Sequence, residues 1–548
     1  MKKIILLVFL ISIIVVGILY SNSTKFNLYD GKYLKPYLFS FGVDEDRYKN
    51  IIDKKYIDPL GVSVTAVSYF YYGNIQKDHT LIEKGLNIVN LLKEYPYKRT
   101  LGNSTVYMYE QTHGSWKAKT WWSGMSNASI ALAYMMAFDI TKKEEYKELS
   151  LYALRGVTNE IKNNGSALIL DRDSYWYKEY VNDLTNVENA QFVLNGFTFS
   201  LIAINSIGSY LDDKQIIDDY KKGLNGFFKL ADRFYDNKNW LYYMLNPKTT
   251  ESMHYGVFDL LLLKSLYYKE DKNVLLEKEI LKRENIFKKH FGLEQNKEGL
   301  IYLSAIGIPY PYWIDIYPGK IVVNYKDGSN KKIEFAPLSN TKTNYERLYY
   351  NVACCNINNI KNIEVYQRKN SIEFLLFEVE PKELIISDNN ELITNNIKEE
   401  FIMNNSGKMI DRLHYEIPYK SELRVRLLLE KELKINDNNL FVINYESSQK
   451  LKNIQIILID NKGNSVSSYY SISDELKSNL VLSPIGFTKY DNLDLIKEIR
   501  LYISPDNEVE STTFKINEVL FNLNKKQLNE LILSEDILKN TFHIKFKD

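Results

Sequence analysis

Cysteine and histidine, the side chains that most often bind zinc, are scarce in this chain of 548 residues. Its two cysteines are the neighbours Cys354 and Cys355, and its six histidines show no HxH or HxxxH spacing. Adjacent cysteines are poorly placed for an ordinary disulfide, which needs Cα atoms about 4.4–6.8 Å apart, so we expect both to be buried as small apolar residues. No metal centre is therefore expected. No nucleotide cofactor is expected either, because no glycine-rich phosphate loop follows a predicted strand.

The chain also lacks an excess of charge of either sign, with 70 lysines and arginines against 69 acidic residues. Without a basic block, no electrostatic field recruits nucleic acid, and we expect no nucleic-acid partner. Apolar residues make up 45% and charged residues 25% of the chain, which is usual for globular proteins. At roughly 150 residues per domain, the length predicts two to four domains.

An uninterrupted uncharged run occupies residues 4–20, directly after Lys2 and Lys3. Its length is close to the roughly 17–25 residues that cross a bilayer. It is long for the apolar part of a cleaved secretory signal, about 7–15 residues, and no A-x-A site follows it, which favours an uncleaved membrane anchor at residues 1–24. Because the two lysines stay cytoplasmic, we expect the rest of the chain to be exported to a cell surface, periplasm or lumen, or secreted if the segment is cleaved.

From about Gly61 to Phe291, apolar residues recur at three- and four-residue spacing in pairs of segments joined by short polar turns. In each pair the first segment is apolar nearly all round or rich in small residues, and the second is amphipathic and charged. The inner and outer rings of an (α/α) barrel require this contrast, so we predict a barrel of about four helical hairpins over residues 25–295. An irregular α-solenoid without a central cavity is the alternative. The four pairs are residues 62–74 with 81–95, 123–140 with 144–161, 189–211 with 216–235, and 254–268 with 274–291.

Beyond about Gly299 the hydrophobic period becomes two, in short segments bounded by Asn, Asp and Gly. We therefore predict two antiparallel β-sandwich modules after the helices, which gives the chain an α plus β multidomain fold. A polar interval places the division near Tyr419. The expected parts are a β-rich module at 296–420, a sandwich at 421–525 and a tail at 526–548. The second sandwich resembles in shape the carbohydrate-binding modules of secreted glycan enzymes.

The connection between the second and third helical pairs is about 25 residues long and contains the stretch "DSYWYKEY", residues 173–180. Connections between helices usually have about two to eight residues, and long connections on a rigid scaffold often carry function. At the end of a barrel such a loop can deliver Glu179 and Tyr180 to a cavity. The structural alternative is that the aromatic rings of Trp176, Tyr177 and Tyr180 only close the barrel end.

"WYKEY" followed by "FVLNGFTFSL", residues 176–180 and 192–201, resembles the W-Y-E-E-Y and F-V-L-N-G-F-x-Y-S-L motifs of the D-glucuronyl C5-epimerases. These enzymes convert glucuronate into iduronate within heparan-type chains. "TWWSGMSNASIALAYMMAFDIT", residues 120–141, is similar to the W-Y-S-A-M-A-Q-G-Q-A segment of that family. The resemblance covers about Asp58 to Phe291. It implies an (α/α) barrel that acts as an isomerase on a uronate-containing, heparan sulfate-like polysaccharide, without a cofactor.

Inversion at C5 of a hexuronate needs an acid/base group on each face of the sugar ring and a partner for the carboxylate. The resemblance implies that Glu179 with Tyr180 serves one face. It places further catalytic tyrosines at Tyr242, of "WLYYM", and, after a shift of two residues, at Tyr255. The side chains implied for sugar binding are Asn127 and Asn195, the stacking wall of Trp121 and Trp122, and the neighbouring Trp176, Tyr177 and His254.

Two positions depart from the family pattern. The family arginine three residues after the tyrosine, suited to pair with the uronate carboxylate, is replaced here by Leu245. The later Tyr-His pair of the family falls on Met253 and His254 when no gap is introduced. Arg172 and Lys178 are candidates for the missing cation.

Three other functions fit the same residues. A polysaccharide lyase removes the same C5 proton but expels the C4 substituent, and often joins an α/α toroid to a following β-sandwich. A glycoside hydrolase would pair Glu179 with Asp173, Asp183 or Glu188 across about 5–9.5 Å. A glycan-binding protein that has lost catalysis would account for Leu245. Four observations separate these functions. Inverted product stereochemistry indicates an epimerase, and a new unsaturated chromophore indicates a lyase. New reducing ends indicate a hydrolase, and binding without turnover indicates a glycan-binding protein.

Overall fold

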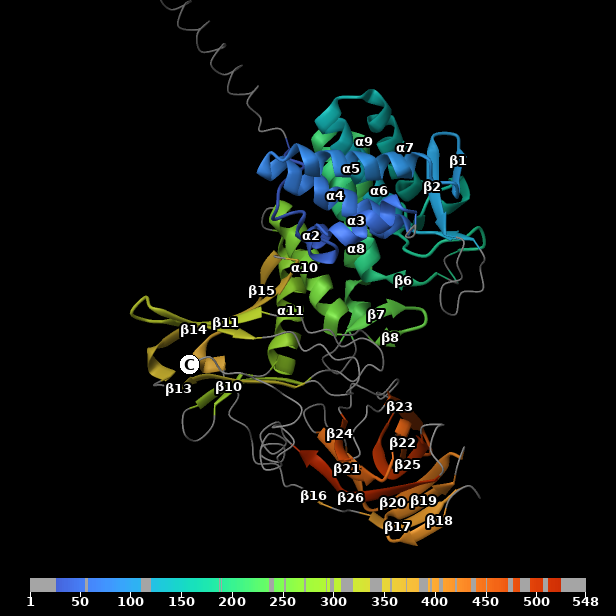
Figure 1. The fold of residues 1–548 in the computed structure, drawn as a ribbon, viewed down its shortest axis with the longest axis vertical. Helices are drawn as coiled ribbons and strands as arrows, with labels where there is room; N and C mark the ends of the chain where they lie inside the picture. Colours follow the sequence, from blue (N-terminus) through green and yellow to red (C-terminus); the bar gives the residue numbers. More distant parts are fainter. Residues whose placement is uncertain are drawn as a thin grey trace, which may run out of the picture. The chain divides into compact units, whose positions relative to one another are not determined.

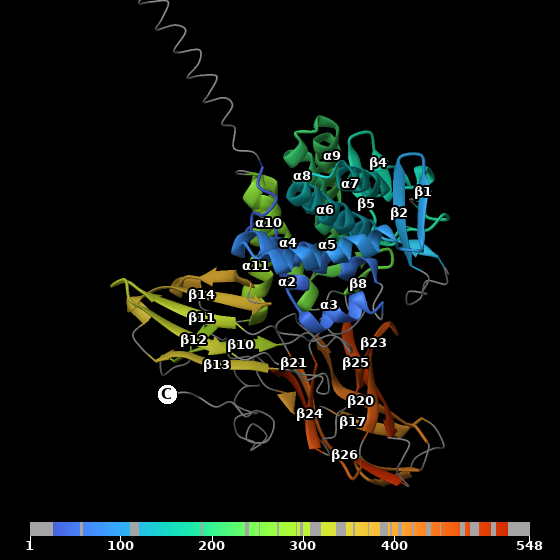
Figure 2. The same ribbon diagram turned by 45° about the horizontal axis from the view of Figure 1, so that its top comes forward.

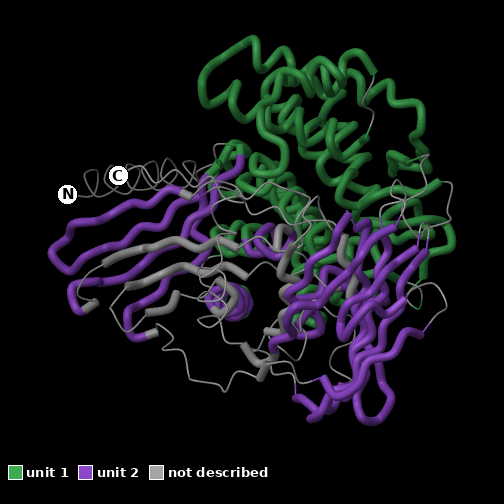
Figure 3. Tube along the Cα trace, turned by 60° about the horizontal axis from the view of Figure 1, so that its bottom comes forward, with its two compact units in different colours: residues 1–231, 261–276, 370–372 green, residues 232–260, 277–369, 373–548 purple. Residues whose placement is uncertain are grey.

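The computed structural model describes residues 26–523, and the described residues form two compact units (Figure 3). The first unit contains residues up to 231 together with 261–276 and 370–372, and the second contains 232–260, 277–369 and the chain from 373. Helices and several β-sheets are both present, as the sequence predicts. Gaps in the description lie at 55–57, 110–119, 187, 189, 236–240, 251–252, 271–272, 292, 296–299, 307–318, 336–346, 355–356, 371, 384–392, 395–396, 404–407, 419–420, 435–439, 450, 472–476, 483–492 and 506–510.

The predicted membrane segment at residues 1–24 and the tail at 526–548 lie outside the described residues, as do Cys355 and the side chain of Cys354. Within the described part of the chain, no helix has the length and apolar character needed to cross a membrane.

The four predicted helix pairs are confirmed, and they follow two short helices, α2 (Lys35–Ser40) and α3 (Glu45–Ile52) (Figure 1). Within the first unit, the first helices of successive pairs pack side by side, α4 on α6 and α6 on α8, and each also packs on the second helix of its own pair. The last pair is divided between the two units, since residues 253–260 belong to the second unit and residues 261–276 to the first. The pairs are α4 (Pro59–Gln76) with α5 (His79–Lys93), α6 (Gly124–Thr141) with α7 (Glu144–Thr158), α8 (Leu194–Leu211) with α9 (Lys214–Leu230), and α10 (Met253–Lys269) with α11 (Val274–Phe291).

Burial explains why each pair has two kinds of helix. Every residue of α6 from Gly124 to Ala137 is buried, so this helix needs apolar or small side chains all round. Helix α9 buries only one face, with Ile216 and Phe227 among its buried residues, and exposes charged residues on the other. Aspartate or serine side chains cap the N-termini of α4, α5, α6 and α9.

Short strands occur in the connections of the first unit, including the long connection before α8, which the sequence predicts to be a loop. Strands β1 (Lys98–Leu101), β2 (Ser104–Tyr109) and β3 (Trp121–Trp122) form one antiparallel sheet before α6. Strands β4 (Ala167–Asp171) and β5 (Ser174–Tyr177) form a hairpin within the long connection before α8, and β5 packs on α9. The stretch that carries Glu179 is therefore attached to a hairpin rather than to a free loop.

In the second unit, strands beyond residue 292 form two smaller sheets and two larger ones, as far as residue 523. The smaller sheets have the orders β13-β10-β9 and β12-β11-β14-β15. Strands β7 (Tyr242–Leu245) and β8 (Thr249–Thr250), which pair with each other, precede α10. The strands of the smaller sheets are β9 (Leu293–Gln295), β10 (Leu300–Ile306), β11 (Gly319–Tyr325), β12 (Asn330–Phe335), β13 (Arg347–Cys354), β14 (Ile360–Lys369) and β15 (Ile372–Val379).

The two larger sheets enclose one hydrophobic core (Figure 2). One sheet has the order β18-β19-β26-β21-β24, with β16 beside β26, and the other has the order β17-β20-β25-β22-β23. Alternate residues of both sheets, such as Tyr415, Leu427 and Leu501, are fully buried in that shared core. The strands are β16 (Ile393–Thr394), β17 (Ile397–Ile402), β18 (Lys408–Asp411), β19 (His414–Pro418), β20 (Leu423–Lys434), β21 (Leu440–Ser447), β22 (Leu451–Asp460), β23 (Ser465–Ser471), β24 (Lys477–Leu482), β25 (Leu495–Pro505) and β26 (Ser511–Leu523).

The expected boundary between β modules near Tyr419 does not coincide with the sheets. Strand β17 pairs with β20, and β19 pairs with β26, so strands on both sides of residue 420 build the same core. The polar interval between residues 387 and 411 thus lies partly within these sheets rather than between two modules. Pairing partners that lie about a hundred residues apart leave no local pattern in the sequence.

We predict that Gly226→Ala destabilises the first unit by about 1–3 kcal/mol, in the range of an overpacked core. A Cβ atom at this position of α9 would lie 1.9 Å from the carbonyl oxygen of Tyr175, so helix and hairpin must move apart. Urea denaturation measures the effect, with the exposed Lys221→Ala on the same helix as control. An unchanged midpoint for Gly226→Ala would show that α9 and β5 do not hold each other in place.

Candidate active site

Backbone hydrogen bonds fix the segment 178–181 on both sides of Glu179. Lys178 N–H donates to the carbonyl of Ser166, and the Lys178 carbonyl accepts from Gly124 N–H, both over 2.9 Å. Val181 exchanges two 3.0 Å bonds with Trp122. Because Gly124 is the first residue of α6 and Trp122 belongs to β3, residues 179 and 180 lie between two fixed points at the start of α6.

The Glu179 carboxylate lies against the first turn of α8. A Cβ atom on Gly196, the third residue of that helix, would lie 2.2 Å from Glu179 Oε2 and 2.7 Å from its Cδ. The N-cap residue Val193 makes no side-chain capping bond, unlike the caps of the other long helices of this unit that carry aspartate or serine. A carboxylate near a helix N-terminus is stabilised in its charged form by the unpaired N–H groups and the helix dipole. Gly196 therefore provides the space that the Glu179 side chain occupies.

Tyr180 stands beside a pair of stacked aromatic rings. Its ring centroid is 5.5 Å from that of Trp121, which stacks on Tyr109 at 4.1 Å with an interplanar angle of 6°. The Tyr109 hydroxyl lies 2.6 Å from the Ser126 hydroxyl. Burial raises the pKa of Tyr109 well above its ordinary value, and the nearby Asp58 raises it further, so Tyr109 is a wall of the site rather than a base.

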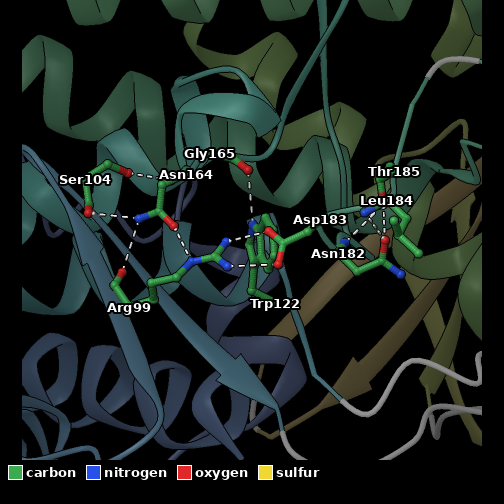
Figure 4. A network of polar contacts seen from close by, with 9 residues as sticks. All are labelled: Arg99, Ser104, Trp122, Asn164, Gly165, Asn182, Asp183, Leu184 and Thr185. Carbon is green, nitrogen blue, oxygen red and sulfur yellow. Dashed lines mark hydrogen bonds and ion pairs between the residues drawn. The ribbon is translucent and has the colours of Figure 1, made fainter.

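A polar network holds the chain just after Tyr180 (Figure 4). Arg99 forms two 3.0 Å contacts with the Asp183 carboxylate, donates to Asn164 Oδ1 over 2.8 Å, and lies 4.7 Å from the centre of the Trp122 ring. Asn164 in turn donates to the carbonyls of Arg99 and Ser104. This fork-like pairing, which orients as well as attracts, joins the hairpin β1–β2 to the loop at Asp183. Sequence reasoning missed Arg99 and Asn164, because neither belongs to a motif.

Several predicted sugar-binding residues belong to the framework instead. The Asn127 side chain is fully buried, accepts from Tyr107 N–H over 3.1 Å and donates to the Thr105 carbonyl over 3.1 Å, so it fastens β2 to α6. Trp122 is also fully buried and donates to the Gly165 carbonyl. Since adjacent strand residues point to opposite faces, Trp121 lines the site while Trp122 faces the core.

The aromatic residues of β5 are equally enclosed. Trp176 is 0% exposed and stacks on Phe197 of α8 at 3.8 Å. Tyr177 is 0% exposed and donates its hydroxyl to the Asp219 carbonyl of α9. These two rings pack the hairpin onto the third helix pair, which agrees with the structural alternative for them. Asn195, next to Gly196 in α8, is 4% exposed and stays a candidate for sugar binding.

The remaining candidates lie in the second unit. Tyr242 opens β7 and is half-buried, with the Lys248 ammonium 4.8 Å from its ring centre. Tyr255 of α10 lies 5.0 Å from Tyr243 between ring centroids. Leu245, at the position of the family arginine, is 1% exposed. His254 belongs to α10, but its side chain lies outside the description.

The two candidate cations for the uronate carboxylate differ sharply. Arg172 is exposed in the turn between β4 and β5. Lys178 is 0% exposed, and its ammonium nitrogen has no hydrogen-bond partner among the described residues. Burial lowers the pKa of Lys178 from 10.5 to about 7, since a charged ammonium loses its hydration there. Lys178 is thus neutral at mildly alkaline pH and does not serve as an exposed carboxylate clamp.

No cluster of His, Cys, Asp or Glu suited to a metal ion occurs in the part of the chain that the structure describes.

Residues 99–284 match the family model of the D-glucuronyl C5-epimerase C-terminus. Over these residues the chain is similar to that family. The segment holding Glu179, Tyr180, Trp121 and Gly196 lies inside the C5-epimerase match. This match supports a carbohydrate epimerase-like function for the helical part.

More distant likenesses accompany this C5-epimerase match. A stretch of 129 residues is 26% identical to the uncharacterized protein MJ1128 of Methanocaldococcus jannaschii, and it covers 23% of this chain and 40% of that protein. A cellobiose 2-epimerase structure from Spirochaeta thermophila is 16% identical, with a TM-score of 0.25 over 33% of this chain and 49% of that one. An unsaturated glucuronyl hydrolase structure from Bacillus sp. GL1 is 10% identical, with a TM-score of 0.33 over 51% and 77%. Likenesses this weak carry no information on activity.

We predict that the stability of the protein rises with pH between about 7 and 9.5 through Lys178. In this range the unfolded lysine binds a proton that the folded one does not, so alkali favours the folded state. Lys178→Met should be more stable than the wild type at pH 7, and the difference should shrink toward pH 9.5.

Urea denaturation at several pH values measures this difference, with the exposed Lys221→Met as control. Equal pH dependence in the wild type and Lys178→Met would mean that Lys178 keeps its charge when folded.

Proposed function

We propose that this protein is an exported, membrane-anchored D-glucuronyl C5-epimerase-like enzyme that inverts C5 of hexuronate residues in a polysaccharide. The four helix pairs form its (α/α) barrel, and strands β16–β26 form a β-sandwich that accompanies it. The observation that carries this proposal is the placement of Glu179 and Tyr180, which backbone bonds hold at the start of two inner helices within the family match.

The geometry suits proton transfer at a carbon atom. The Glu179 carboxylate lies beside Gly196 in the first turn of α8, and we assign to it the removal of the C5 proton. Tyr180 and Trp121 are buried, at 9% and 6% exposure, and we propose that their rings border the bound sugar ring. As the proton leaves C5, charge moves onto the uronate carboxylate, and a proton returned to the opposite face gives the inverted product.

The group that acts on the opposite face is a prediction from the sequence alone, with Tyr242 and Tyr255 as candidates. Within the second unit, Lys248 supplies a cation beside the Tyr242 ring. Two further parts of the proposal also rest on the sequence alone: the uronate polysaccharide as substrate, and the membrane as the site of attachment.

The structure gives little support to the alternative function as a glycoside hydrolase. Asp183 is engaged on both oxygens by Arg99, which is unsuited to a carboxyl that must gain and lose a proton. Asp173 is exposed in the β4–β5 turn, and Glu188 is exposed as well. A lyase would use the same base, so only the product separates it from an epimerase.

We predict that the protein incubated with an unsulfated glucuronate polymer in deuterated water incorporates deuterium at C5 while the polymer keeps its length. NMR of the H5 signal measures the exchange. Glu179→Gln should lower the rate at least a hundredfold, in line with the contribution of general acid–base catalysis, and Tyr180→Phe should lower it to a lesser extent.

Asp183→Asn is the matched control, because it removes a carboxylate of the same loop outside the proposed chemistry. It should keep most of the exchange activity. An absorbance from an unsaturated product would identify a lyase, and new reducing ends that vanish in Asp183→Asn would identify a hydrolase. Exchange that survives in Glu179→Gln would contradict the proposed role of this glutamate.

A further inference from the structure

The outward face of the sheet β17-β20-β25-β22-β23 carries three arginines. Val425 and Leu427 of β20 point into the shared core. Because successive residues of a strand alternate between the two faces of a sheet, Arg424 and Arg426 point outward. Arg500 of β25 lies directly opposite Arg426 in the register. Side-chain exposures of 49% for Arg424, 40% for Arg426 and 31% for Arg500 place these guanidinium groups at the surface.

The pairing of Arg426 with Arg500 is unusual, because like charges directly opposite each other destabilise a sheet. A single carboxylate holds them together. Glu498 is 2% exposed, accepts from Arg426 Nη2 over 2.8 Å and from Arg500 Nε over 2.6 Å. Burial alone would raise the pKa of Glu498, but the two arginines hold it below its ordinary value. One negative charge thus fixes two guanidinium groups side by side on this face.

Aromatic rings border the arginines on this face. Phe401 of the edge strand β17 lies opposite Arg426 and is 45% exposed. Tyr502 lies opposite Arg424, whose guanidinium is 4.8 Å from the centre of its ring. From Phe401 across Arg426 to Arg500 the row spans two strand spacings, about 10 Å.

Fixed guanidinium groups and exposed rings recognise complementary parts of one kind of ligand. Guanidinium pairs with carboxylate or sulfate in a fork geometry, and an aromatic ring packs on the apolar face of a sugar. Because Glu498 already orders two of the arginines, less side-chain entropy is lost when the ligand binds.

We infer that this outward face is a binding site for an anionic polysaccharide, with Arg426 and Arg500 pairing its carboxylate or sulfate groups and Phe401 and Tyr502 contacting its sugar rings. The inference rests on the proposed function only for the choice of polymer. In this inference the β-sandwich binds the polysaccharide, and the helical part modifies the hexuronate residues of the same polysaccharide.

The test measures binding of the full-length protein to an unsulfated glucuronate polymer, a sulfated one and neutral xylan by affinity electrophoresis. The triple variant Arg426→Gln, Glu498→Gln, Arg500→Gln removes the charges without leaving a buried carboxylate unpaired. It should bind the acidic polymers at least tenfold more weakly. Phe401→Ala, a change at an exposed ring that the fold tolerates, should weaken binding about threefold. Arg368→Gln, an arginine of β14 with 48% exposure, is the matched control and should bind as the wild type does.

Binding of the unsulfated polymer identifies carboxylate as the recognised group, and binding of the sulfated polymer alone identifies sulfate. Equal binding by the wild type and the triple variant, or equally tight binding of xylan, would overturn the inference. Exchange at C5 of a short oligosaccharide should be unchanged in the triple variant. A wild type that binds polymer through these residues without any exchange would contradict the proposed function and leave this inference standing.

Discussion

The candidate site depends on the backbone hydrogen bonds that attach residues 178–181 to the start of α6 and to β3. A glutamate in a free connection of this length would sample many positions, and each would lose the alignment that proton transfer needs. With Lys178 and Val181 both fixed, the Glu179 side chain lies against the first turn of α8, where Gly196 leaves room for it. Arg99 extends the same constraint to Asp183.

Holding this segment in place costs stability, because Lys178 is buried without a hydrogen-bond partner in the described structure. An apolar side chain at this position would not carry that cost. The packed rings of Trp176 and Tyr177, which fasten the same hairpin to α8 and α9, offset that cost. Destabilising features persist where the surrounding structure determines the conformation strongly, and such features cluster at functional sites.

Much of this arrangement is readable from the sequence, because local patterns determine it. The helix pairs follow from the 3.6-residue period, and the family motif points to Glu179 and Tyr180. Side-chain direction is not readable without knowledge of the short strands: Asn127 and Trp122 are predicted to bind sugar, yet Asn127 of α6 bonds to the backbone of β2, and Trp122 of β3 faces the core. The paired arginines Arg426 and Arg500 lie 74 positions apart in the chain and meet only through the register of β20 and β25. Long-range strand pairing of the same kind explains why the module boundary predicted near residue 420 does not coincide with the sheets.

The proposed role of Glu179 is tested most directly by a double-mutant cycle between Gly196 and Glu179, in which deuterium exchange at C5 is measured for each variant. A methyl group at residue 196 would occupy the place of the Glu179 carboxylate, so Gly196→Ala should lose nearly as much exchange activity as Glu179→Gln. The variant with both changes should be no slower than Glu179→Gln alone, since both act through one carboxylate. Full activity in Gly196→Ala, or losses that multiply in the double variant, would contradict the claim that this glycine positions the base.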